Sequence, residues 1–232
     1  MKLPPRKELL RRLRVLYSAR KNVLLVGEAG VGKTTLLLTL MGMSPLQLCG
    51  ETSCLQKVCD DFEVKLGWNR GRLSLVERKN RILRFLEQRK NIVAFDNVAY
   101  VRPQVARFIA CLAARMPVWI TCRSDQRKEV GHIWEHLYAF TRVEVPPFNL
   151  AETSEVIQRV VAIGIVQNDV LLHAADLHRI SKGIPGNLDR LLNELKKRHY
   201  PIDRSSGLKL LELDSKIHEL TSAILKGHPR TG

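Results

Sequence analysis

The chain has 232 residues, of which 45% are hydrophobic, and a formal net charge of +15 at pH 7. This length suits one large domain or a core with a small appendage, and the apolar content is ample for a buried core. The longest apolar runs are much shorter than a membrane-spanning helix, so we expect no transmembrane segment. Residues 1–7 lack the apolar stretch of a signal peptide. Five cysteines, an odd number, favour reduced thiols. We therefore expect a cytoplasmic protein.

The strong positive charge is unusual for a metabolic kinase. Such a field attracts polyanions, and nucleic acid is the commonest polyanion in a cell. We therefore predict duplex DNA as a partner. An acidic protein partner would satisfy the same charge, and this alternative stays open.

The first predicted element is a helix over residues 5–17, where leucines recur at helical spacing and arginines occupy the other face. It leads to a short apolar run, residues 23–26, which predicts a buried strand. A glycine-rich turn follows this strand, and residues 33–38 predict the start of the next helix.

Residues 27–34 have the pattern G-x-x-x-x-G-K-T of a phosphate-binding loop. The glycines let successive N–H groups point into one concavity that binds an anion, and the helix dipole adds its positive end. We expect Lys33 to reach the outer phosphates of ATP or GTP and the Thr34 hydroxyl to hold Mg²⁺. The predicted nucleotide-binding residues are Gly27, Glu28, Ala29, Gly30, Val31, Gly32, Lys33, Thr34 and Thr35.

A strand over residues 46–50 and two helices are predicted next. Thr52 is the expected N-cap of a helix that runs to Leu66 and is closed by Gly67. Ser74 is the expected cap of a second helix, residues 75–90, and Glu77 completes a capping box.

The helix at 75–90 is strongly basic. It could follow a DNA backbone through phosphate contacts, and a solvated helix face is an equally good interpretation. Trp68, with Arg70 and Arg72, could mark a loop that stacks on nucleic acid, or it could be a core residue. The basic residues of the helix are Arg78, Lys79, Arg81, Arg84, Arg89 and Lys90.

A second buried run, residues 91–95, ends at Asp96. In a parallel sheet the carboxyl ends of the strands gather beside the phosphate loop, where a carboxylate can hold Mg²⁺ through water. Asn97 follows, and an amide can orient a water molecule but cannot accept its proton. We therefore expect slow hydrolysis, unless Glu28 or a neighbouring subunit supplies the base.

Residues 102–116 predict a helix, and residues 117–124 predict a strand with Thr121 and Arg123 at its polar tip. An arginine at this edge could clamp the γ-phosphate. A surface arginine or a contact to a polyanion is the alternative. A short alternating strand is predicted at 142–145.

Strands separated by helix-length segments indicate a parallel sheet covered on both faces, so we predict a three-layer α/β P-loop core over residues 1–149. Only helical patterns follow, at 151–163, 169–181 and 187–198. They predict a small helical lid over residues 150–200, followed by a C-terminal helix and tail over 201–232. With the nucleotide between loop and lid, subunits are expected to assemble side by side as a homo-oligomer.

Together, the motifs at residues 27–35, 95–98, 120–124 and 177–188 resemble those of the AAA+ and STAND ATPases. The resemblance covers residues 6 to about 195. Within these families the chain looks most like the small branch that includes secretion-pathway A-type ATPases and ATP-binding helper subunits of transposition.

The resemblance implies catalytic roles for Lys33, Asp96 and Arg123, and Mg²⁺ ligation by Thr34 and Asp96. Many ATPases of this kind place a glutamate directly after the aspartate, where it polarises the attacking water; this chain departs from that pattern with Asn97, which we count among the catalytic residues because its amide can still orient water. Arg123 matches the strand-tip sensor of the family. In the lid, relatives often place an arginine after the Gly-Ile-Pro turn, where this chain has Gly186, with Arg190 one turn further on.

The motifs and the charge together favour an ATP-dependent, DNA-associated regulator, similar to a transposition helper, which assembles with ATP and hydrolyses it slowly. The alternative is an ATP-operated signalling or scaffold switch that binds protein and not DNA.

Overall fold

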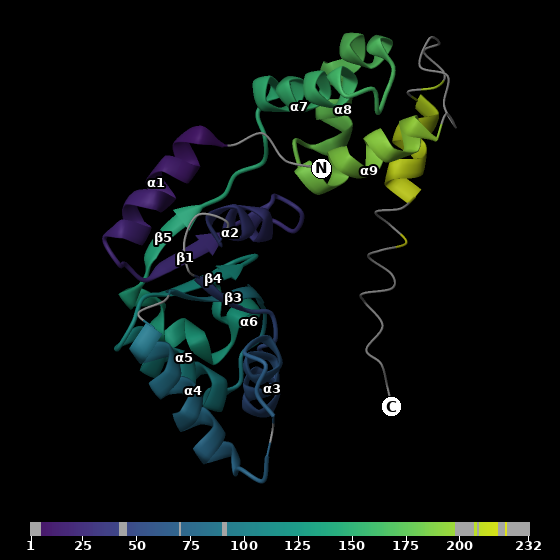
Figure 1. Cartoon of the computed structure of the whole chain (residues 1–232). Helices are drawn as coiled ribbons and strands as arrows, with labels where there is room; N and C mark the ends of the chain where they lie inside the picture. Colours follow the sequence, from purple (N-terminus) through teal and green to yellow (C-terminus); the bar gives the residue numbers. More distant parts are fainter. Residues whose placement is uncertain are drawn as a thin grey trace. The chain divides into compact units, whose positions relative to one another are not determined.

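The structure is a computed structural model that describes residues 6–41, 46–69, 71–89, 92–197, 207, 209–217 and 221 (Figure 1). Contacts divide the chain into two compact units, which meet in sequence between Pro146 and Pro147. Of the predicted features, Arg70, Lys90 and the end of the helix at Arg198 lie outside the described residues, as does most of the segment 201–232.

The elements of the first unit follow the predicted order, except that α6 and η1, between β4 and β5, were not predicted from the sequence. Its elements are α1 (Lys7–Ser18), β1 (Val23–Val26), α2 (Lys33–Met41), β2 (Leu46–Cys49), α3 (Leu55–Lys65), α4 (Leu75–Arg89), β3 (Ile92–Val98), α5 (Pro103–Ala113), β4 (Val118–Cys122), α6 (Arg127–Val130), the 3₁₀ helix η1 (His132–Ala139) and β5 (Thr141–Glu144).

The strands form one five-stranded parallel sheet with the order β2-β3-β4-β1-β5. Every residue of β1 and β4 is buried, as expected for strands covered on both faces. Because the strands are parallel, the carboxyl ends of β1, β3 and β4 lie at one edge of the sheet.

Side chains on β1 alternate between the two faces of the sheet. Leu24 and Val26 join the apolar core formed with α3, α4 and α5, whereas Val23 and Leu25 join the core formed with α1 and α2. This arrangement confirms the predicted sheet with helices on both faces (Figure 1).

The capping box predicted for α4 is confirmed. The backbone N–H and the hydroxyl of Ser74 donate to Glu77 Oε2 at 2.8 and 2.7 Å, and α4 begins at Leu75. In return the Glu77 N–H donates to Ser74 Oγ at 3.4 Å, so that the box satisfies the N–H groups of Ser74 and Glu77, which the helix itself leaves without partners.

Thr52 is not the N-cap of α3, and this prediction is wrong. The helix begins at Leu55, and Cys54 occupies the cap position without a side-chain cap bond. Glu51 Oε1 instead accepts the Ser53 N–H at 2.7 Å, and this local turn takes up the segment that contains Thr52. The predicted closure is confirmed, because Gly67 follows the helix with a φ of 68°.

The second unit is helical. It contains α7 (Leu150–Ala162), the 3₁₀ helix η2 (Asn168–His173), α8 (Ala174–Ser181) and α9 (Pro185–Lys196), and residues 209–217 are helical as well. The sequence predicts one helix over 169–181, and the structure divides this segment into η2 and α8. Apolar side chains from all these elements form a separate core.

A close backbone contact holds the turn between α8 and α9. Gly183 has a φ of 66°, and its carbonyl accepts the Phe148 N–H at 2.7 Å. A Cβ at this position would lie 2.3 Å from the Phe148 carbonyl oxygen, so only glycine fits.

Across the described ranges, no helix combines the length and the apolar character that crossing a membrane requires.

A buried ion pair joins α3 to α4. The Arg78 guanidinium donates to both carboxylate oxygens of Glu63, at 2.9 and 2.6 Å, and also contacts Asp60. The Glu63 side chain is only 1% exposed. Hydrogen bonds to the two carboxylates raise the pKa of Arg78 further above its ordinary value.

Replacement of Arg78 by methionine should lower the free energy of unfolding by about 3–5 kcal/mol, because it leaves the Glu63 charge buried without a partner. Urea unfolding followed by circular dichroism measures this loss. Arg84→Met, an exposed change on the same helix, should stay within about 0.5 kcal/mol of the wild type. Equal effects of the two changes would contradict the assigned role of the ion pair.

Candidate functional site

The loop between β1 and α2 is compact because its glycines adopt conformations that other residues avoid. Gly30 and Gly32 have φ values of 81° and 95°. At Gly27 a Cβ would lie 2.5 Å from the carbonyl oxygen of Val145, just after β5. The backbone therefore packs against the neighbouring strand and curls into the turn that the sequence predicts.

Lys33 lies at the start of α2, and its side chain turns back into this loop. Its Nζ donates to the carbonyl oxygens of Gly27 and Glu28 at 2.6 and 2.8 Å. The residue is 8% exposed, and no carboxylate of the described chain lies within ion-pair distance of it. A largely buried ammonium whose hydrogen-bond partners are all neutral carbonyls can attract an anion.

The surroundings of Lys33 act on its titration. Burial lowers the pKa of the Lys33 ammonium, and the nearby Arg123 guanidinium lowers it further. Cys122 and the Asp96 carboxylate act in the opposite direction and raise it. Arg123 follows β4, is exposed, and makes no ion pair within the described ranges. Arg123 directly follows β4, and Lys33 follows the loop after the neighbouring strand β1, so both residues lie at the carboxyl edge of the parallel sheet.

Asp96, on β3, is hydrogen-bonded both to α2 and to the neighbouring strand β4. Thr34 Oγ1 donates to Asp96 Oδ2 at 2.7 Å, and Thr121 Oγ1 donates to Asp96 Oδ1 at 2.6 Å. Asp96 is 9% exposed. The hydroxyl and the carboxylate are hard oxygen donors of the kind that Mg²⁺ prefers, so Thr34 and Asp96 fit a magnesium ion.

The sequence places Thr121 at a strand tip without giving it a function. In the structure its hydroxyl also accepts the Asn97 N–H at 2.7 Å, so one side chain orients both Asp96 and the residue that follows it. The sequence held one signal for this orienting role, because Thr121 is a polar residue within the otherwise apolar run of β4. The packing of Val145 on Gly27 had no comparable signal in the sequence.

Asn97 adopts a left-handed conformation, with a φ of 54°, inside β3. The register between β3 and β4 shifts between Phe95 and Val98, so Asn97 lies in an irregularity of the ladder. Its side chain is exposed. Asparagine tolerates this conformation better than most residues, which accounts for an amide at this position.

The remaining predicted residues lie around the loop or away from it. Glu28 and Ala29 are exposed on the turn, Val31 is buried in the core with α1 and α2, and Thr35 lies half-buried in the first turn of α2. In the helical unit, Arg190 Nη2 donates to Ser215 Oγ at 2.9 Å, and Gly186 is exposed in the first turn of α9. Within the described part of the chain, no three His, Cys, Asp or Glu side chains form a metal-binding group.

No protein-family model and no curated protein matches the chain. Solved structures match it in fold. A Walker-type ATPase of Pyrococcus abyssi has a TM-score of 0.68 and 19% identity, over 95% of this chain and 74% of its own.

Two further solved structures are similar. The Orc1 protein of Aeropyrum pernix, solved in complex with DNA, has a TM-score of 0.63 and 18% identity over 98% of this chain and 69% of its own. Cdc6p of Pyrobaculum aerophilum has a TM-score of 0.61 and 16% identity over 82% of this chain and 60% of its own. The likeness confirms the predicted α/β fold of the P-loop NTPases.

The left-handed backbone at Asn97 predicts an order of stability among its variants. Asn97→Ala should lower the free energy of unfolding by about 1 kcal/mol relative to Asn97→Gly, because a Cβ without a local hydrogen-bonding group is strained in this conformation. Chemical denaturation measures the difference. The same pair of changes at exposed Gln104, in the first turn of α5, should reverse the order, because alanine favours a helix. Alanine and glycine of equal stability at position 97 would argue against a strained backbone there.

Proposed function

We propose that this chain binds ATP with Mg²⁺ and hydrolyses it slowly. The observation that carries the proposal is the position of Lys33, a largely buried ammonium bonded only to loop carbonyls, one residue from the Thr34–Asp96 hydrogen bond. A triphosphate would supply the missing negative charge, and the carboxylate would supply a metal ligand.

In this proposal the loop residues 27–35 bind the phosphates, and Lys33 contacts the outer ones. Thr34 and Asp96 hold Mg²⁺, which neutralises charge on the phosphate oxygens when it is bound. Thr121 keeps the Asp96 carboxylate oriented. Arg123 acts as the strand-tip sensor, and its place directly after β4, the strand beside β1, supports a position near the phosphates.

The proposed slow rate follows from Asn97. Its amide can orient a water molecule but cannot accept the proton, so the chain lacks the usual base at this position. Glu28, exposed on the loop, and a residue of a neighbouring subunit are the two alternative sources of a base.

Lys33→Ala should weaken ATP binding by about ten- to a hundredfold, the value of a charge-assisted hydrogen bond of about 1.5–3 kcal/mol. Titration with a fluorescent ATP analogue in magnesium buffer measures the affinity. Lys57→Ala, an exposed lysine on α3, is the matched control and should leave the affinity unchanged. A wild-type chain without affinity for ATP or GTP would overturn the proposal.

The proposed cellular role is that of a DNA-associated regulator that assembles side by side with ATP and is released by hydrolysis. Its support is the net charge of +15 and the fold likeness to Orc1, which was solved in complex with DNA. Residues 1–149 would form the ATPase core, residues 150–200 a lid over the nucleotide, and residues 201–232 a C-terminal helix. More specifically, we propose that this regulator acts as an ATP-binding helper protein in DNA transposition.

Duplex DNA should bind more tightly with ATP than without it, and the affinity should fall steeply with salt, because phosphate contacts release counterions. Fluorescence anisotropy with a labelled duplex at several salt concentrations measures both effects. Lys33→Ala should abolish the ATP dependence and keep the basal binding. DNA binding that is absent, or insensitive to salt, would exclude the DNA role and leave the ATP-operated, protein-binding switch as the function.

A further inference from the structure

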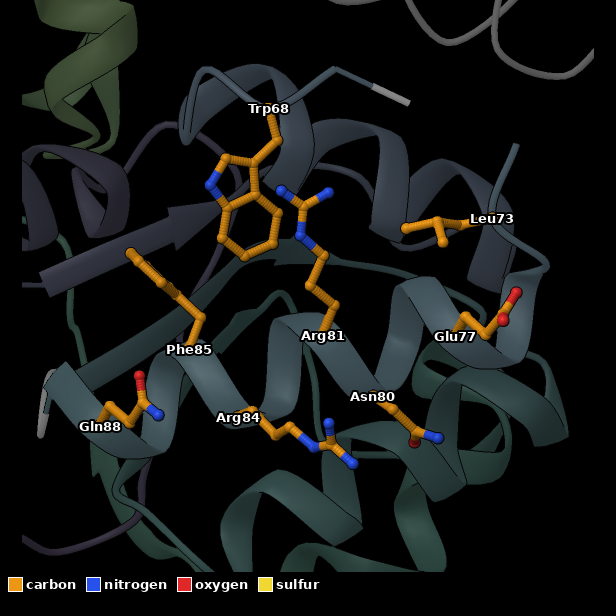
Figure 2. A pocket seen from close by; sticks show the side chains of 8 residues that line it. All are labelled: Trp68, Leu73, Glu77, Asn80, Arg81, Arg84, Phe85 and Gln88. Atoms are coloured by element: carbon orange, nitrogen blue, oxygen red, sulfur yellow. The ribbon is translucent and has the colours of Figure 1, made fainter. Parts of the chain in front are cut away.

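A cavity of about 450 Å³ lies beside α4, in the first unit and away from the phosphate loop. Its walls include Trp68 and Leu73, from the segment between α3 and α4, and Arg81, Arg84 and Phe85 from α4 itself (Figure 2). We call this cavity the α4 pocket.

The interior of the α4 pocket is apolar. The rings of Trp68 and Phe85 meet edge to face, with centroids 5.0 Å apart and an interplanar angle of 84°. Both rings pack on the core beneath α3, α4 and α5. Leu73 at the wall is 39% exposed, and neighbouring Val76 on α4 is 62% exposed. The pocket therefore offers a small apolar surface, large enough for one side chain of a partner.

Four arginines lie on or around the pocket without acidic partners. Arg81 lies over the Trp68 ring, 4.1 Å from its centroid, and Arg89 lies over the Phe85 ring at 4.9 Å. In Figure 2 the Arg81 side chain extends from α4 toward Trp68, whereas the Arg84 side chain points away from Trp68; both residues line the pocket. Within the described ranges, no carboxylate is in ion-pair distance of Arg72, Arg81, Arg84 or Arg89.

The acidic residues nearby offset this charge only in part: Glu77 also lines the pocket, at the end of α4 that is nearest Leu73, and contributes one negative charge there. Glu77 is held by Ser74 in the capping box, and Glu87 forms an ion pair with Arg115 at 2.8 Å. The pocket therefore combines a carbon-lined interior with a positively charged rim. Tryptophan and arginine are the residues most enriched where a few contacts carry most of the binding energy.

We propose that the α4 pocket docks an acidic segment of a partner protein. One leucine or aromatic side chain of the segment enters the hollow between Trp68, Leu73 and Phe85, and flanking Asp or Glu residues pair with Arg81 and Arg84. This site depends on neither ATP nor DNA binding, and it would supply a protein partner in addition to the proposed function.

Nucleic acid fits the same charge but fits the pocket less well. Stacking of a base needs an open aromatic face. Here Arg81 covers the Trp68 ring and Arg89 covers the Phe85 ring. An apolar side chain needs only the carbon-lined hollow, so the geometry favours a peptide over a single strand.

A phage-displayed library of random peptides, selected on the full chain, tests this proposal. Counter-selection on the Arg81→Glu, Arg84→Glu double variant removes peptides that bind elsewhere. The most enriched peptide is then synthesised with a fluorescent label, and its affinity is measured by anisotropy. A single-stranded oligonucleotide and a DNA duplex of similar charge serve as competitors.

The enriched peptides should combine acidic residues with a leucine or an aromatic residue. Arg84→Glu and Leu73→Ser should each weaken binding at least about tenfold, as at other interface positions of this kind. Arg12→Glu is the matched control, because Arg12 is exposed on α1, which packs on the other face of the sheet, and it should leave the affinity unchanged. Thermal unfolding of each variant checks that the fold is intact.

Three outcomes would overturn the proposal. The selection yields no peptide above the counter-selected background, or the peptides bind Arg84→Glu and Arg12→Glu alike. In the third outcome, Arg84→Glu and Leu73→Ser weaken the binding of the oligonucleotide but not the binding of the peptides. The α4 pocket would then be a nucleic-acid surface. All these results are independent of ATP affinity, so failure here leaves the proposed function untouched.

Discussion

The carboxylate of Asp96 holds the candidate site together. It accepts one hydrogen bond from Thr34, at the start of α2, and one from Thr121, on the adjacent strand β4. The three residues come from widely separated parts of the chain, and they meet because parallel strands bring their carboxyl ends to one edge of the sheet. The irregularity at Asn97 belongs to the same arrangement, since its N–H donates to the Thr121 hydroxyl.

The phosphate loop depends on this edge as well. Gly27 can approach the Val145 carbonyl only because it has no side chain, and this contact places the loop against the end of β5. Lys33 then closes the turn with two bonds to loop carbonyls. In the proposed function, an ammonium held in this way would need little further ordering to bind a triphosphate.

The helices α3 and α4 do not contribute to the candidate nucleotide site but support the α4 pocket. The Arg78–Glu63 ion pair fixes the two helices against each other, and α4 presents the remaining arginines outward. Trp68 and Phe85 are thus held in a defined geometry at the surface, which a docking site requires. One helix therefore carries a structural arginine on its buried side and a candidate binding surface on its other side.

Local signals accounted for most of the elements and for some of their ends. Ser74 and Glu77 are close in sequence, so the capping box could be predicted without the fold. Thr52 is not the cap because Glu51 accepts the Ser53 N–H in a competing local turn. The sequence does not show whether this hydrogen bond or a cap bond from Thr52 is the stronger. The break between η2 and α8 has no glycine or proline to mark it, so it too was missed.

The sequence alone determined the fold class and the glycine-rich turn between β1 and α2, because hydrophobic periodicity and the glycine pattern are properties of neighbouring residues. Only the tertiary structure decided the strand order, the bonds of Asp96 to Thr34 and Thr121, and the stacking of Arg81 on Trp68. The strand order and the bonds of Asp96 depend on residues far apart in the chain, which meet only when the strands pair with their neighbours. The Arg81–Trp68 contact depends on how α4 packs against the segment that follows α3. No pattern of neighbouring residues encodes either arrangement.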